Sequence, residues 1–412
     1  MRRLLLASAL ATVLYTYVLF PVIVLARAAL RPRPHHEADI LPAVTVVIAA
    51  HNEEASIGEK LENVLALDYP RDQLAVVVAS DGSDDATEEV VRGFEDRGVR
   101  LLALPRVGKA AALNAAVAAA KGDILVFSDA NSMFAPDAIR MLVRPFADPE
   151  VGGVAGNQRY VEVADADAIA SGEQRYWDFD RLMKDAESRG GNVISATGAI
   201  YAIRRKLFVP VPENVTDDFV TSTRVIAQGH RLVFAAGAVA YEPVAKSGGQ
   251  EFDRKVRIMT RGLTGVVQMR ELLDPRAHGF YAVQLFTHKV LRRLMAIPLV
   301  VAAATSAALW NRGPLYRLTA TAQAVVYALG ALGLLIPGRS VARRKPVVLA
   351  TFFCFVNLAS LKAAWNVVTG RTITRWEPHR EAPAPEPPGR RPATRSARER
   401  SDAGHGSPGT EA

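Results

Sequence analysis

The stretch VTVVIAAHNEE, Val44 to Glu54, opens the region that decides the fold of this chain. It joins a β-branched apolar run, Val44–Ala50, to polar residues. LAVVVASDGSDD (Leu74–Asp85) and ILVFSDANS (Ile124–Ser132) repeat the pattern, with apolar runs at Leu74–Ser80 and Ile124–Ser128. Short apolar runs bounded by turn residues predict buried strands. Between them lie helical patterns and one more strand-like run: helices at Ala55–Leu65, Asp85–Arg97 and Lys109–Lys121, and a strand at Val99–Leu104. We therefore predict an α/β domain with a mostly parallel, Rossmann-like sheet covered by helices on both faces.

Polar side chains follow three of these strands at the point where each strand ends. Because parallel strands end at one edge of the sheet, His51–Glu54, Asp81–Asp85 and Asp129–Ser132 should converge on one crevice, where ligands of such sheets bind. Each segment alone could simply begin a helix, since Ser, Asp and Asn are good N-cap residues. Their occurrence at successive strand ends favours a binding site.

Apolar runs at both ends of the chain predict membrane helices. Leu4–Ala26 carries no charge and is long enough to cross a bilayer, so residues 1–27 are predicted to form an anchor; a cleaved secretory signal is the alternative. About three further spans are predicted within residues 294–368. Their cores are Leu294–Trp310, Leu315–Pro337 and Pro346–Val368.

The charged segments between and after these runs predict how the chain is oriented. The basic loop Gly338–Lys345 indicates the cytoplasmic side, and the polar domain, two crossings away, should face the same side of the cell membrane. Residues 276–293 mix apolar and basic side chains, as in an interfacial amphipathic helix or the polar start of the next span. Residues 381–412 are rich in Pro, Arg, Ser and Gly and predict a disordered tail.

The overall charge is basic, with a formal net charge of +8. The arginines gather beside apolar runs and in the tail, which favours anionic lipid headgroups over nucleic acid as the partner. The single cysteine, Cys354, excludes a disulfide framework and a cysteine-rich metal site.

Several motifs together resemble a known enzyme family. VTVVIAAHNEE, VVVASDGSDDAT, GKAAALNAAVAAAKGDILVFSDAN and TGAIYAIRR followed by TDDF are similar to the inverting glycosyltransferases of family 2. That group includes cellulose, chitin, hyaluronan and poly-N-acetylglucosamine synthases. The similarity covers roughly Ala43–Met269, so residues 43–270 are predicted to form a GT-A domain, the nucleotide-sugar-binding fold of this family.

The resemblance implies a nucleotide-sugar donor, with uracil as the base. It places Asp81 at the base ring and the segment from Ala50 through His51, Asn52 and Glu53 around base and ribose. Lys109 would add positive charge near the donor, although a solvated lysine at a helix start is an equal alternative.

A divalent cation, Mn²⁺ or Mg²⁺, would neutralise the departing diphosphate. The resemblance names Asp129 as its anchor. Where the family's DxD motif has a second aspartate, this chain has Asn131, whose amide oxygen remains a suitable ligand.

Inverting transfer needs a carboxylate that takes the proton from the acceptor hydroxyl. Thr216-Asp217-Asp218 resembles the family's TED triplet, which implies Asp218 as general base with Asp217 beside it; an N-capped helix start is the structural alternative.

Further residues are implied for the acceptor and the diphosphate. Thr197 and Gly198, with Arg204 and Arg205, match the stretch that lines the acceptor, although the two arginines could instead contact lipid headgroups. Arg257 and Arg261 lie in a basic segment that replaces the QxxRW motif of processive synthases. This segment would close over the diphosphate or rest on anionic lipid.

These residues together predict a membrane-bound inverting glycosyltransferase that moves a sugar from a UDP-sugar to an envelope polysaccharide or glycolipid. The absent QxxRW leaves processive synthesis open. One alternative is transfer to a polyprenyl phosphate, an acceptor that is already anionic and needs no strong base. Another is a non-catalytic nucleotide-binding component of a synthase complex, and a partner subunit is left open in either case.

Overall fold

The computed structural model describes residues 1–160, 168–242, 248–336, 339–342 and 344–371. At its centre is a mixed sheet of eight strands in the order β3-β2-β1-β4-β7-β6-β8-β5. The strands are β1 (Val44–Ala50), β2 (Leu74–Asp81), β3 (Val99–Leu104), β4 (Ile124–Phe127), β5 (Met133–Phe134), β6 (Val151–Tyr160), β7 (Tyr201–Arg204) and β8 (Arg231–Glu242). The four strands predicted from the sequence are all present.

The first half of the sheet is parallel, as predicted. Strand β1 pairs with β2 on one side and β4 on the other, and β2 pairs with β3, all in parallel. Because these strands run in one direction, the turns after Ala50, Asp81 and Phe127 meet at one edge. The second half is mostly antiparallel. Strand β7 pairs antiparallel with both β4 and β6, and β5 pairs antiparallel with β8, whereas β6 and β8 pair in parallel.

Helices cover both faces of the sheet, which explains why β1 is buried at every residue. Alternate residues point to opposite faces of a strand. Val46 and Ile48 join the core that contains Leu61 of α3, whereas Val47 joins the core that contains Leu113 of α5. The helices of this domain include α3 (Ile57–Leu65), α4 (Thr87–Arg92), α5 (Lys109–Ala119), α6 (Ala138–Val143), α7 (Ala168–Gly190), α8 (Asp217–Ala227) and α9 (Gly248–Gln268).

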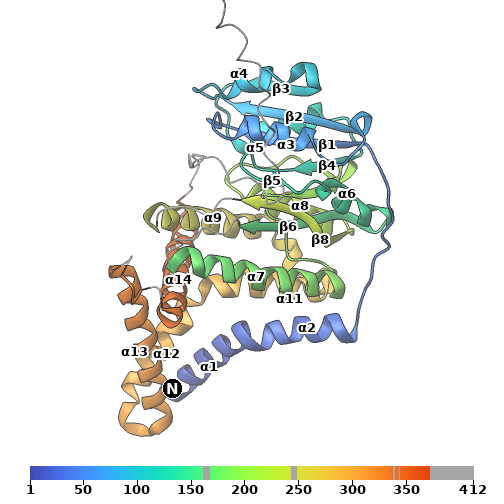
Figure 1. Cartoon of the computed structure of the whole chain (residues 1–412). Coiled ribbons are helices and arrows are strands. Elements are labelled where there is room, and N and C mark those ends of the chain that lie inside the picture. The colour runs from blue at the N-terminus through green and yellow to red at the C-terminus, as the bar shows by residue number, and fades with distance from the viewer. Residues whose placement is uncertain (161–167, 243–247, 337–338, 343, 372–412) are drawn as a thin grey trace, which may run out of the picture.

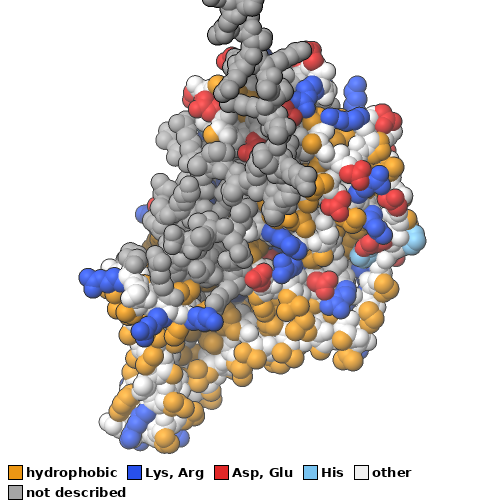
Figure 2. All heavy atoms as spheres, viewed as in Figure 1, with side chains coloured by type: hydrophobic (Ala, Val, Ile, Leu, Met, Phe, Trp, Pro, Cys, Tyr) orange, Lys and Arg blue, Asp and Glu red, His pale blue; other side chains and the backbone are white. Residues whose placement is uncertain are grey.

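Long apolar helices lie to one side of this domain (Figure 1). Within the described residues, three helical stretches are long and apolar enough to cross a membrane: Arg2–Leu30, Pro314–Leu335 (α13) and Lys345–Val368 (α14). The first comprises α1 (Arg2–Leu14), a π-helical turn (Tyr15–Leu19) and α2 (Phe20–Leu30). Hydrophobic side chains cover much of the visible surface of this region (Figure 2). The predicted spans therefore coincide with apolar helices.

A bent pair of helices supplies the fourth candidate span. The segment Phe280–Leu294 meets α12 (Ala296–Ala308) at 52°. Its first part is α11 (Phe280–Leu285), followed by a π-helical turn at Phe286–Val290 and a 3-10 turn at Leu291–Leu294. The predicted interfacial helix at 276–293 is thus a series of short helical pieces. The predicted disordered tail at 381–412 lies outside the described residues.

Close contacts hold the membrane-type helices to one another and to the domain. A side chain at Gly333 of α13 would overlap Thr351 of α14, so glycine permits close approach of these helices. Phe20 and Val24 of α2 pack on Met183 of α7. The apolar helices and the sheet domain are therefore joined by a packed interface.

Candidate active site

The turns after β1 and β2 are tied together by hydrogen bonds. The amide of Asn52 donates to Ser83 Oγ at 3.1 Å, and its side-chain oxygen accepts from the amide of Asp84 at 2.8 Å. Asn52 has φ of 56°, a left-handed conformation that asparagine tolerates. The amide of Glu53 donates to Thr87 Oγ1 at 2.7 Å. The segment from Ala50 to Glu53 is therefore held against the turn that follows Asp81.

Asp81 is fully buried and organises a neighbouring loop. Its Oδ1 accepts from the amides of Val107 (2.6 Å) and Gly108 (2.8 Å), and its Oδ2 accepts from the Arg106 guanidinium at 3.0 Å. The Asp81 carbonyl accepts from Nδ1 of His51, which is also buried, at 2.9 Å. The predicted base-binding carboxylate is thus occupied by protein donors, and Asp81 holds the 106–108 loop at the start of α5.

Lys109 links two of the predicted carboxylates. Its Nζ lies 2.9 Å from Asp129 Oδ1 and 3.3 Å from Asp217 Oδ2. Burial opposes the charged lysine, but the carboxylates of Asp129 and Asp217 outweigh burial and raise its pKa. Lys109 is therefore a charged member of the site and not a solvated residue.

Asp218 lies at the start of α8 and faces a cavity. Burial and the charge of Asp217 raise the pKa of Asp218 to about 6, while Lys109 opposes the rise. Thr216 is the N-cap residue, but its side chain makes no capping hydrogen bond, and its Oγ1 is buried without a partner among the described residues. A side-chain cap on α8 therefore does not explain why Thr216, Asp217 and Asp218 occur together here.

The turn after β4 offers oxygen ligands for the implied cation. The Asp129 carboxylate is 36% exposed, and Gly198 leaves room for it, because a Cβ there would lie 2.7 Å from Asp129 Oδ2. No group of three His, Cys, Asp or Glu side chains suited to a metal exists in the part of the chain that the structure describes. One carboxylate, the nearby Asn131 amide and substrate phosphates match the way proteins hold Mg²⁺. The residues present thus fit a cation that arrives with a diphosphate.

Helix α9 brings a predicted arginine to this cluster. Arg261 is close enough to Asp217 for their charges to interact, and its Nε is buried with no hydrogen-bond partner among the described residues. An unpaired buried donor is costly unless a ligand satisfies it, so Arg261 suits an anionic group. Arg257 lies four residues earlier on the same helix and is half-buried.

The acceptor residues predicted from the sequence lie at two different ends of β4, some near Asp129 and others at the opposite end. Thr197 lines the same cavity as Asp218, and Gly198 contacts Asp129. Arg204 pairs with Ile124 at the opposite end of β4 from Asp129 and donates to the carbonyls of Phe146, Asp148 and Val151. Arg205 follows it and is exposed. The prediction that Arg204 contacts the acceptor is therefore wrong, because Arg204 fixes the loop before β6. The prediction for Arg205 stays a prediction.

The structure adds two ionisable residues that the sequence analysis did not identify, a buried lysine and a partly buried glutamate. Lys60 of α3 donates to Ser128 Oγ at 2.8 Å and to the Ser132 carbonyl, and burial lowers its pKa to about 7. Glu242 accepts from Ser132 Oγ at 2.6 Å, and burial raises its pKa to about 7. Both residues support the turn that carries Asp129. The position of Lys60 on the apolar face of α3, between Ile57 and Val64, was an available signal.

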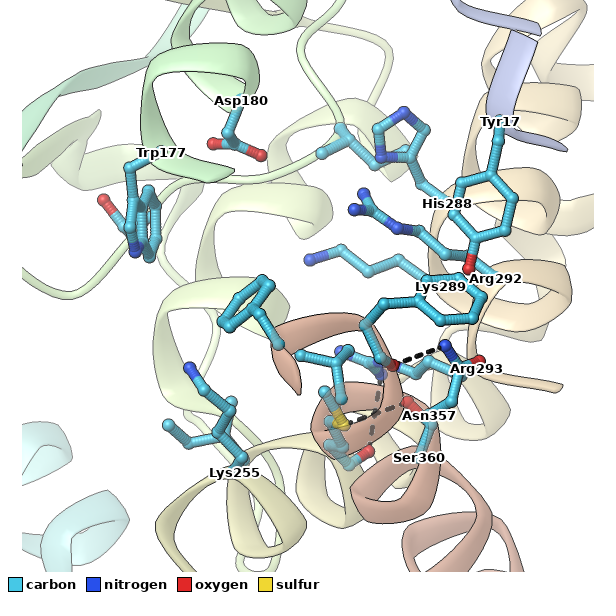
Figure 3. Close-up of a pocket in the computed structure, with 18 of the residues that line it drawn as sticks. Tyr17, Trp177, Asp180, Lys255, His288, Lys289, Arg292, Arg293, Asn357 and Ser360 are labelled. Atoms are coloured by element: carbon cyan, nitrogen blue, oxygen red, sulfur yellow. Dashed lines mark hydrogen bonds between the residues drawn. The ribbon is translucent and has the colours of Figure 1, made fainter. Parts of the chain in front are cut away.

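A cavity of about 780 Å³ extends from Asp218 and Thr197 toward the apolar helices. Its walls include residues of α7, α9, α13 and α14. Figure 3 shows Trp177 and Asp180 on one side, and Lys289, Arg292 and Tyr17 on the other. The candidate base therefore opens onto a space shared by the sheet domain and the membrane-type helices.

The sheet domain is similar in sequence and fold to known proteins. A family model described as "Glycosyltransferase like family 2" matches residues 42–265. The poly-beta-1,6-N-acetyl-D-glucosamine synthase of Staphylococcus aureus (strain COL) is 26% identical over 240 residues, which are 56% of this chain and 57% of that protein. The probable glycosyltransferase YdaM of Bacillus subtilis (strain 168) is 27% identical over 218 residues, 49% of this chain and 51% of that protein. The chain thus spans a little over half the length of these curated relatives.

One solved structure resembles most of the chain. The mannosyltransferase PcManGT of Pyrobaculum calidifontis, solved with GDP-Man and Mn²⁺, has 27% identity and a TM-score of 0.69, covering 89% of this chain and 99% of that one. The prediction of a GT-A fold is confirmed.

Proposed function

This chain belongs to the glycosyltransferase like family 2, and we propose that it is a membrane-bound inverting enzyme that uses a UDP-sugar. The acceptor would be a polysaccharide or glycolipid of the cell envelope. The observation that carries the proposal is the grouping of Asp129, Lys109 and Asp217, joined by contacts of 2.9 and 3.3 Å, beside Asp218 at the cavity.

In this proposal Asp218 is the general base. The acceptor oxygen forms a bond to the anomeric carbon while the bond from that carbon to the diphosphate breaks and its electron pair leaves with the nucleotide. The proton of the acceptor hydroxyl passes to Asp218. A raised pKa suits this task, because a carboxylate with a pKa nearer to neutral is a stronger base.

The donor would lie across the turns after β1, β2 and β4. Ala50, His51, Asn52 and Glu53 would contact base and ribose. Asp81 would act on the base indirectly, by holding the 106–108 loop. Lys109, Arg257 and Arg261 would bind the diphosphate. Asp129 and Asn131 would hold a divalent cation, which neutralises charge on the leaving diphosphate.

The apolar helices support a place in the cell membrane. The basic residues around Arg339 and Arg344 in the α13–α14 loop favour a cytoplasmic position for that loop. Two candidate spans separate this loop from the sheet domain, so the domain would face the same side of the membrane.

The test uses membranes that contain the full chain, a panel of UDP- and GDP-sugars, and Mn²⁺ or Mg²⁺. Transfer to envelope material should release the nucleoside diphosphate, with UDP-sugars preferred. Asp218→Asn should lower transfer at least 100-fold, because one positioned base contributes about 10²–10⁴-fold. Asp96→Asn, at an exposed acid, is the matched control. Full transfer by Asp218→Asn would contradict the base assignment.

A further inference from the structure

The cavity beside Asp218 joins two chemical environments. At one end it is lined by Thr197, Thr216 and Asp218, and Thr197 Oγ1 and Thr216 Oγ1 are buried without partners among the described residues. At the other end its walls are mostly apolar side chains of α13 and α14; Asn357 and Ser360 of α14 also line it, and their side chains bond to the Phe353 carbonyl and Met259 Sδ. The apolar side chains include Val326, Leu329, Leu349, Phe352, Phe353 and Val356. A molecule that fills this cavity must be polar at one end and apolar at the other.

A cluster of cations lies between the two ends. Lys289 comes from the π-helical turn, and Arg292 and Arg293 come from the 3-10 turn that precedes α12. Figure 3 shows Lys289 extended into the cavity. Its Nζ lies 5.4 Å from the ring centroid of Phe219, the residue that follows Asp218. The positive charge is therefore next to the candidate base.

The place of this cluster in the chain suits a lipid headgroup. It lies just before the bend of 52° that leads into α12, where the bent span would pass from headgroups to hydrocarbon. Arginine and lysine at such a boundary bind anionic phosphate. A carbohydrate chain would need hydrogen-bonding walls along the apolar half of the cavity, whereas a lipid tail gains about 0.8 kcal/mol per CH₂ group that it buries.

We propose that this cavity is the acceptor site and that the acceptor is a membrane lipid with an anionic phosphate in its headgroup. The phosphate lies on Lys289, Arg292 and Arg293, and the tail lies along α13 and α14. This inference rests on the proposed transferase function and specifies its acceptor.

The reacting oxygen has two sources within this class of lipid. If it is a hydroxyl next to the phosphate, its proton goes to Asp218. If it is a phosphate oxygen, no proton moves. In both cases the new bond joins this oxygen to the anomeric carbon, and the nucleoside diphosphate departs with the electron pair.

The test places the full chain in phosphatidylcholine vesicles with labelled donor. Polyprenyl phosphate, phosphatidylglycerol or a soluble oligosaccharide is added separately, and label is followed into the organic and aqueous phases. We expect label in the organic phase with one of the two anionic lipids, and the productive lipid identifies the source of the oxygen. Lys289→Met should raise the KM for that lipid at least tenfold with a smaller change in kcat.

Two further variants separate a specific role from misfolding. Val326→Trp narrows the apolar part of the cavity and should impair transfer to a long-chain lipid more than to its short-chain analogue. Arg317→Met is the control, because Arg317 lies on α13 outside the cavity lining and donates to the Trp310 carbonyl. It should leave the KM for the lipid unchanged.

The outcomes distinguish this inference from the proposed function. Transfer to the soluble oligosaccharide alone, unaffected by Lys289→Met and Val326→Trp, would overturn the lipid acceptor and leave the transferase intact. Donor hydrolysis without labelled lipid would also count against the lipid acceptor. Absence of both donor binding, measured by calorimetry, and donor turnover would overturn the proposed function itself.

Discussion

Replacing Lys109 by methionine removes the cation that the three site carboxylates share. The substitution keeps an unbranched side chain, one atom shorter, and deletes the ammonium that lies 2.9 Å from Asp129 and 3.3 Å from Asp217. The positive charge also favours the ionised form of Asp218. We expect Lys109→Met to make Asp218 harder to ionise.

The size of the effect follows from the charges involved. Two unit charges about 4 Å apart interact by about 4 kcal/mol at an effective dielectric constant of about 20. Asp218 is next to Asp217, the residue that Lys109 contacts. Removing the lysine charge should therefore cost the ionised form of Asp218 only a fraction of this interaction energy. Since one pH unit corresponds to about 1.4 kcal/mol, a loss of about 1.4–2.8 kcal/mol would raise the pKa of Asp218 by about one to two pH units.

The pH dependence of kcat/KM for the donor measures this change. With a base whose pKa is raised to about 6, activity should rise with pH through that value and level off above it. In Lys109→Met the rising limb should move to higher pH, because a larger share of Asp218 is protonated at each pH. Lys121→Met, at an exposed lysine near the end of α5, should keep the parental profile. An unchanged limb in Lys109→Met would refute the electrostatic reasoning.

Two further substitutions test the support of the turn that carries Asp129. Gly198→Ala would put a methyl group 2.7 Å from Asp129 Oδ2. We expect at least a tenfold loss of kcat/KM, measured by activity, in a protein that circular dichroism shows to be folded. Full activity would show that the carboxylate does not need this space. Lys60→Met leaves the Ser132 carbonyl without its lysine donor and should lower the free energy of unfolding by about 1–3 kcal/mol, measured by denaturation in detergent. A stability equal to that of the parent would contradict this structural role for Lys60.

The parallel half of the sheet could be predicted because its signals are local. Val44–Ala50 and Val99–Leu104 were predicted to the residue, since continuous apolar runs between turn residues need no knowledge of their partners. The helix predicted at Asp85–Arg97 is instead α4 followed, after Gly93, by a 3-10 turn at Glu95–Arg97. Glycine and local packing decide such helix ends.

Part of the grouping could be predicted where a family motif lies at a strand end or a helix start. Asp129, Lys109 and Asp217 were all named from the sequence, and the structure brings them together. Arg204 was not predictable in this way, because its direction depends on the antiparallel register of β7 with β4. Lys60 was missed because a lysine in a helix usually faces solvent.

The sequence by itself determined which segments form the parallel strands, where the apolar helices lie along the chain, and which residue types follow the strand ends. These follow from periodicity and from motifs, which are properties of neighbouring residues. Tertiary structure alone decided that Asp81 is enclosed by the 106–108 loop, that Lys109 joins Asp129 to Asp217, and that Asp218 opens onto a cavity reaching α13 and α14. Each of these depends on groups that lie far apart along the chain, and their distances and burial exist only once the sheet and the helices have packed.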